Sequence, residues 1–234
     1  MSEIRLIDED SLALAARYIH EGKLIVMPTD TVYGIACDPF NEIAIEALFE
    51  AKHRPLSKSL QVLLADTSEI EALDLRLPYP LDVLSASLLP GAFSPICIAS
   101  ADTQLQTIKI EATARTQGIR VPDAESTRRI LAATGPVAAS SANISGQSSA
   151  QSVQDALAQL GESVALYLDD GPTPGPVAST VVTTSKTDAD GIAILRQGVI
   201  PESQLRDVIH ANQSMHQHSN GHRPDESNTS ETSA

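Results

Sequence analysis

The fold class is decided by residues 24–34, which read LIVMPTDTVYG. The first four residues, 24–27, are an apolar run of the kind that a strand buried on both faces shows, and Pro28 ends it. Before this run, apolar residues recur at helical spacing and predict a helix over residues 11–21. A buried strand that follows a helix indicates an α/β fold.

The rest of the chain keeps this alternation of strands and helices. Asn41 can cap a helix whose apolar positions follow a 3.6-residue period. Further apolar runs predict strands at residues 60–64, 95–99, 118–121, 137–140, 164–168, 180–183 and 192–195. Helical periodicity predicts helices at residues 68–73, 81–89, 124–133, 153–160 and 203–210. This order predicts a twisted mixed β-sheet with helices packed on it.

Length and composition divide the chain into one domain and a tail. The 234 residues, 42% of them hydrophobic, are enough for one sizeable core, and no internal repeat is present. We therefore expect a single catalytic domain over residues 1–211. Residues 212–234 contain almost no apolar side chains and cannot bury enough surface to offset their ordering entropy, so they are expected to be a disordered polar tail.

Charge and cysteine content exclude several classes of protein. The net charge of −14 opposes binding that relies on neutralising nucleic-acid phosphates. No apolar run approaches the roughly 20 residues that span a bilayer, and the first ten residues lack a signal-peptide core, so a cytoplasmic protein without membrane contact is expected. Cys37 and Cys97 have neither the number nor the spacing of a disulfide framework or a zinc site, and no metal site is predicted.

Three segments carry residues suited to binding chemistry. Lys52, Arg54 and Lys58 gather three of the 16 basic residues within seven positions. Such a cluster can hold a triphosphate, because Arg offers a planar fork of donors and Lys a mobile charge. The alternative is that Lys52 and Arg54 compensate a helix dipole, which leaves Lys58 unexplained.

The other two segments each follow an apolar run. The stretch PTDTVYG, residues 28–34, places hydroxyls and a carboxylate where ligands gather in open α/β sheets, although the same residues also form ordinary turns. The stretch SSANISG, residues 140–146, offers small hydroxyl residues that let backbone amides approach an anion. Neither a Walker loop nor a dinucleotide fingerprint accompanies them, and no GxSxG surrounds a serine nucleophile.

Taken in order, these segments resemble the YrdC-like family of threonylcarbamoyl-AMP synthases. PTDTVYG is similar to the family's substrate loop, Lys52-x-Arg54 to its K-x-R element and Ser141-x-Asn143 to its S-x-N element. The resemblance runs from about residue 10 to 205 and includes four further matching segments, at residues 90–91, 119–122, 179–182 and 195–198. It departs at residues 58–60, where members often have Pro before Leu, and at Leu63, where some have His. The long C-terminal extension of some relatives is expected to be missing, because the tail is short and polar.

The resemblance implies two sets of site residues within a YrdC-like fold. The residues expected to face ATP are Lys52, Arg54, Lys58, Thr116, Asn143 and Arg196. The residues expected to face L-threonine are Thr31, Arg120, Ser141 and Ser179. Outside this context Arg120 reads as an ordinary edge charge and Ser179 as a loop hydroxyl. The sequence identifies no catalytic base.

The resemblance also implies a reaction, a cofactor and partners. L-Threonine, bicarbonate and ATP would form threonylcarbamoyl-AMP and pyrophosphate, a nucleotidyl transfer with Mg²⁺ bound to the ATP. The product would pass to a transferase complex that modifies tRNA at the adenosine beside the anticodon. Two alternatives stay open: an RNA-binding module, with binding kept weak by the −14 charge, and a different small-molecule activity such as carbamoyl transfer in metal-centre maturation.

Overall fold

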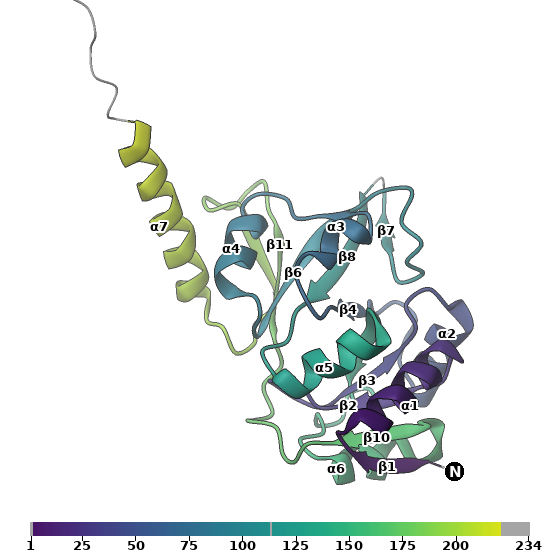
Figure 1. Ribbon diagram of the computed structural model, residues 1–234. Helices are drawn as coiled ribbons and strands as arrows, with labels where there is room; N and C mark the ends of the chain where they lie inside the picture. The colour runs from purple at the N-terminus through teal and green to yellow at the C-terminus, as the bar shows by residue number, and fades with distance from the viewer. Residues whose placement is uncertain (1, 113, 221–234) are drawn as a thin grey trace, which may run out of the picture.

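The computed structural model describes residues 2–112 and 114–220, which form one mixed sheet with helices packed against it (Figure 1). The strand order is β1-β10-β2-β3-β9-β4-β8-β6-β11-β12, with β5 paired to β6 and β7 to β8. The strands are β1 (Glu3–Leu6), β2 (Ile25–Met27), β3 (Gly34–Cys37), β4 (Gln61–Leu63), β5 (Leu75–Arg76), β6 (Phe93–Ala99), β7 (Lys109–Glu111), β8 (Ala114–Arg120), β9 (Val137–Ser141), β10 (Leu166–Asp169), β11 (Thr180–Thr184) and β12 (Ile192–Arg196).

Seven α-helices accompany the sheet in the described part of the chain. They are α1 (Glu9–His20), α2 (Glu42–Ala51), α3 (Glu69–Ala72), α4 (Leu81–Leu88), α5 (Glu125–Thr134), α6 (Val153–Leu160) and α7 (Glu202–Asn220). The predicted cap of α2 is confirmed, because the Asn41 side chain accepts a hydrogen bond of 3.2 Å from the Ala44 amide. The predicted α/β fold with a mixed sheet is confirmed as well.

The sequence did not predict four short strands, β1, β3, β5 and β7. The most important of them is β3, whose four residues are all buried. It pairs antiparallel with β2 on one side and β9 on the other, so PTDTVY is the connection between two neighbouring strands. A four-residue strand containing Gly and Cys has too little periodicity and too weak a β propensity to be recognised; its two partners create it.

The helices cover the two faces of the sheet unequally. Along β2, Val26 packs with α2 and α6 on one face, whereas Ile25 and Met27 pack with α1 and α5 on the other. Leu63 and Ala139 lie at the edge of this second cluster and also line a cavity. Helices α1 and α5 therefore cover only part of this face of the sheet. The uncovered part, over the remaining strands, contains the candidate site.

Helix α7 is longer than the sequence predicted. It packs beside α4 at the edge of the molecule (Figure 1) and buries Leu205 and Ile209. Arg206 fixes its first turns through ion pairs of 3.0 Å to Asp188 and 2.7 Å to Asp190. The helix continues to Asn220, so the expected start of the tail at residue 212 falls within it, and residues 221–234 lie outside the described part. None of the described helices is long and apolar enough to cross a membrane.

Candidate functional site

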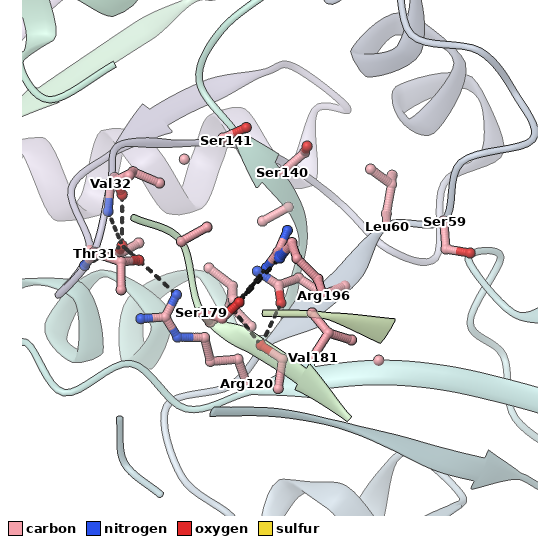
Figure 2. A pocket seen from close by; sticks show the side chains of 18 of the residues that line it. Thr31, Val32, Ser59, Leu60, Arg120, Ser140, Ser141, Ser179, Val181 and Arg196 are labelled. Atoms are coloured by element: carbon pink, nitrogen blue, oxygen red, sulfur yellow. Dashed lines mark hydrogen bonds between the residues drawn. The ribbon is translucent and has the colours of Figure 1, made fainter. Parts of the chain in front are cut away.

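A cavity of about 210 Å³ lies on the open part of the sheet (Figure 2). Small residues on its floor give it depth: Gly34 on β3, Gly118 on β8 and Ala139 on β9. A Cβ atom at Gly118 would lie 3.2 Å from the Ile96 side chain, so a larger residue there would fill part of the floor. The size suits a small polar molecule.

The four residues predicted to face threonine all line this cavity: Thr31, Arg120, Ser141 and Ser179. They come from four different segments, namely the loop after β2, the end of β8, the end of β9 and the residue before β11. Figure 2 shows Thr31 and Arg120 joined on one side of the cavity and Ser179 joined to Arg196 on another. The fold thus brings together residues up to 148 positions apart in the sequence, from Thr31 to Ser179.

Arg120 is a buried cation rather than an ordinary edge charge, with 3% of its surface exposed. Its Nη1 donates to Thr31 Oγ1 at 2.9 Å, its Nε donates to the Gly91 carbonyl at 3.0 Å, and its Nη2 forms an ion pair with Asp30. Burial lowers its pKa, and the Asp30 carboxylate acts against that effect. The side chain is therefore held rigidly, and its charge is largely compensated by Asp30.

The PTDTVYG segment is held in place by its own hydrogen bonds. Thr29 Oγ1 donates to the Val32 carbonyl at 2.6 Å and accepts from the Val32 and Thr31 amides, each at 3.2 Å. In this tight turn the Thr29 hydroxyl bonds to backbone groups two and three residues later in the chain. The turn places Thr31 against Arg120. PTDTVYG can therefore form an ordinary turn and present Thr31 to a ligand in the same conformation.

The residues predicted to face ATP are distributed differently. Arg54 and Arg196 line the cavity. Lys58 lines an adjoining cavity of about 450 Å³, which shares Ser59 and Leu60 with the first. The other three lie outside both linings: Lys52, Thr116 and Asn143.

Thr116 lies on β8, outside the lining of both cavities. It shares a strand face with Gly118 and Arg120 because side chains alternate along β8. It pairs with Lys109 of β7, whose carbonyl its hydroxyl approaches at 3.5 Å. Thr116 is therefore placed between the first cavity and Lys109, which lines the second.

Lys52 lies beneath the SSAN segment, with 1% of its surface exposed. Its Nζ donates to the carbonyl oxygens of Ser141 and Asn143, which belong to the end of β9 and the loop after it. Burial, followed by the charges of Arg54 and Lys58, lowers the pKa of Lys52 to about 7. Lys52 therefore supports the loop directly, and compensation of the α2 dipole does not account for its position.

Two buried polar atoms near the cavity have no hydrogen-bond partner among the described residues: Arg54 Nε and Asn143 Oδ1. Both side chains are otherwise well bonded. Arg54 Nη2 donates to the Ser59 carbonyl at 2.7 Å, and Asn143 Nδ2 donates to the Ile144 and Gln147 carbonyls at 2.8 and 2.9 Å. An unsatisfied buried polar atom costs about 1–3 kcal/mol, so such a pair is more typical of a binding site than of a core.

Three cations line the first cavity, and two of them, Arg54 and Arg196, have no carboxylate partner among the described residues. In the described part of the chain, neither forms an ion pair with a carboxylate, whereas Arg120 has Asp30. Arg196 instead donates to the Ser179 carbonyl, from Nε at 3.1 Å and from Nη2 at 3.0 Å. Two guanidinium groups that lack a carboxylate partner and lie at a cavity wall suit an anionic ligand such as a phosphate.

The sequence reasoning missed two residues that line the cavity, Gln61 on β4 and Ser94 on β6. Gln61 is an isolated polar residue in the apolar run LQVLL, residues 60–64, and strand alternation places it on the same face as Leu63. That isolated glutamine was the available signal. Ser94 had none, because the strand that contains it was predicted to begin at residue 95.

No three His, Cys, Asp or Glu side chains gather in a metal-binding arrangement within the residues that the structure describes. Asp30, the carboxylate beside the cavity, already faces Arg120. A divalent cation in this site would therefore depend on ligands from a bound molecule.

The fold and the site together define a single-domain α/β protein with a hydroxyl-lined, cationic binding cavity on one face of a mixed sheet. The chain belongs to the Sua5/YciO/YrdC family, whose model, described as "Telomere recombination", matches residues 17–198.

Individual relatives support this assignment. A Mycobacterium leprae protein is 35% identical over 198 residues, which cover 85% of this chain and 87% of its own. The threonylcarbamoyl-AMP synthase of Bacillus subtilis is 33% identical over 204 residues, 86% of this chain and 57% of its own. The structure of Pyrococcus abyssi Sua5 complexed with L-threonine matches with a TM-score of 0.77 and 28% identity, over 89% of this chain and 60% of that one.

Proposed function

We propose that this protein is an L-threonylcarbamoyladenylate synthase, a nucleotidyltransferase that uses L-threonine, bicarbonate and ATP. One observation carries the proposal: Thr31, Arg120, Ser141 and Ser179 converge on a single small cavity beside two unpaired guanidinium groups. Two relatives named threonylcarbamoyl-AMP synthase, from Bacillus subtilis and Pyrococcus abyssi, and the threonine complex of Pyrococcus abyssi Sua5 point to the same activity. ATP binding is typical of the family.

The chemistry needs orientation and charge rather than a protein nucleophile. The threonine amine attacks the carbon of bicarbonate, and loss of water gives the N-carboxylate. A carboxylate oxygen then attacks the α-phosphorus of ATP, and the bond to the leaving pyrophosphate breaks. Positioning and electrostatic stabilisation are the dominant contributions to such transfers.

The residues divide between the two larger substrates. We assign the α-carboxylate of threonine to Arg120, whose remaining N–H groups are held at the end of β8, where ligands collect in α/β sheets. We assign the phosphates of ATP to Arg54, Arg196 and Lys58. Lys52 supports them from beneath the SSAN loop by donating to the carbonyl of Asn143, a residue of that loop. Mg²⁺ would enter with ATP, held by phosphate and water oxygens.

The activated product is an unstable mixed anhydride, so a second enzyme must consume it. We propose that a tRNA threonylcarbamoyl transferase complex does so in the cytoplasm, at the adenosine beside the anticodon.

Pyrophosphate release from ATP tests the proposal. The expected result is release that requires both L-threonine and bicarbonate, with a product that retains AMP and the threonine carbon skeleton by mass spectrometry. Arg54→Ala should sharply reduce release at sub-saturating ATP, because the KM for ATP rises. Arg129→Ala is the matched control, since Arg129 pairs on the surface with Glu9 at 2.8 Å, outside the cavity lining. Release that does not depend on threonine would contradict the proposal.

A further inference from the structure

Gln61 lies on the cavity floor at the end of a directed chain of hydrogen bonds. Ser94 Oγ donates to Gln61 Oε1 at 2.9 Å, and Ser94 Oγ also lies 2.8 Å from Ser179 Oγ. A serine hydroxyl has a single proton. Because the Ser94 proton points to Gln61, the proton between the two serines must belong to Ser179.

This direction fixes what Ser179 can offer a ligand. Its proton is committed to Ser94, and one of its two lone pairs accepts from Arg196 Nη2 at 3.0 Å. The remaining lone pair makes Ser179 a hydrogen-bond acceptor toward the cavity. Ser94, which is 1% exposed, cannot reverse the chain without losing its bond to Gln61.

The same direction fixes Gln61 as a donor. Its carbonyl oxygen is occupied by Ser94, and its amide nitrogen has no partner among the described residues. Gly118, the neighbour of Gln61 on β8, has no side chain to cover it. The cavity floor therefore presents an N–H donor, Gln61, next to an acceptor, Ser179.

A ligand that complements this pair has an N–H group beside an anionic oxygen. We propose that Ser179 and Gln61 together bind the N-carboxylate formed from threonine and bicarbonate, with Ser179 accepting its N–H and Gln61 donating to a carboxylate oxygen. Free threonine offers the N–H group without the adjacent oxygens, so Gln61 contributes chiefly once bicarbonate takes part. The inference rests on the proposed function, because the N-carboxylate is an intermediate of that reaction.

Gln61→Glu is the decisive variant. A glutamate keeps an oxygen for Ser94 but replaces the donor by a second acceptor, which repels a carboxylate. The KM for bicarbonate should rise about tenfold or more, while the KM for ATP should change by less than about twofold. Gln204→Glu, an identical charge change at an exposed position of α7, should leave both KM values unchanged.

Two further measurements keep the test decisive. Gln61→Met removes the donor without adding charge and should also raise the KM for bicarbonate. This variant provides the test if Gln61→Glu fails to fold. N-Carbamoyl-L-threonine, a stable molecule with the same N–H and carbonyl arrangement, should bind the wild type more tightly than Gln61→Met by calorimetry, which requires no turnover.

The outcomes separate the two proposals. A wild type that releases no pyrophosphate in response to threonine and bicarbonate contradicts the proposed function, and the calorimetry then decides the role of Gln61. A functional wild type with an unchanged bicarbonate KM in Gln61→Glu overturns this inference alone. Equal increases in the constants for bicarbonate and ATP would also overturn it, since they would indicate a structural role for Gln61.

Discussion

Gly198 lies against residues 178 and 179, where two loops approach each other too closely for any side chain. A Cβ atom built there would lie 2.3 Å from the Ala178 carbonyl oxygen and 2.5 Å from the Ser179 carbonyl oxygen. Ordinary contact begins at about 3.4 Å, so Gly198→Ala must separate the two backbones by about 1 Å. The Ser179 carbonyl that is displaced is the one that receives two bonds from Arg196.

The cost of this change can be worked from the contacts. Overpacking a rigid site costs about 1–3 kcal/mol, and the separation strains the 3.0 Å bond from the Val199 amide to the Ala178 carbonyl. We expect a loss of about 2–4 kcal/mol in the free energy of unfolding, which for a chain of this size lowers Tm by about 5–10 °C. A shift of about 1 Å in Ser179 should lower kcat/KM for threonine on the order of a hundredfold.

Urea unfolding and steady-state kinetics measure the two effects on one preparation. Gly175→Ala is the matched control, because it lies in the same connection before β11 and its Cβ would meet nothing within 4 Å. It should match the wild type in both assays. A Gly198→Ala protein with wild-type stability and an unchanged kcat/KM for threonine would refute the reasoning, because the two loops would then be free to move apart at no cost.

Three other predictions follow from the site. Arg120→Ala should raise the KM for threonine far more than that for ATP, and Arg54→Ala should do the reverse; equal effects in steady-state kinetics would contradict the division of the site. Because burial and the charges of Arg54 and Lys58 lower the pKa of Lys52 to about 7, ATP binding at pH 8 should be accompanied by proton uptake, since the phosphates favour the ammonium form. Calorimetry in buffers of different ionisation enthalpy measures this uptake, and its absence would show that the protonation of Lys52 does not change on ATP binding. Truncation after Asn220 should leave turnover and Tm unchanged, since the predicted site residues all precede it; a several-fold loss of activity would show that the removed segment reaches the site.

The buried segments were predictable from the sequence because their patterns are local. LIVM forms β2 as expected, and Asn41 caps α2, since an apolar run and a cap each depend on a few neighbouring residues. The strand β3 was not predictable, because its pairing with β2 and β9 holds it in place. The extension of α7 past His210 was also missed, since its polar sequence gives no apolar stripe.

The site was predictable to the extent that it resembles a family pattern. Motif matching located Thr31, Arg120, Ser141 and Ser179, which the fold brings to one cavity. It could not distinguish a residue that lines the cavity from one that supports it, such as Lys52, because that depends on which carbonyl groups the ammonium reaches. Gln61 was missed for a similar reason, since the orientation of its amide depends on a hydroxyl 33 positions later.

Under the proposed function, the arrangement of charge accounts for how an acidic protein separates an amino-acid position from a phosphate position in neighbouring parts of one site. Arg120 shares its charge with Asp30, so the threonine side of the site is close to neutral and binds through directed N–H groups. Arg54 and Arg196 have no such acid, so the phosphate side keeps its full positive charge. If Asp30 were absent, Arg120 would attract phosphate as strongly as its neighbours do, and ATP could compete for the amino-acid position. On the proposed function, we therefore expect the buried ion pair to contribute selectivity between the two substrates more than stability.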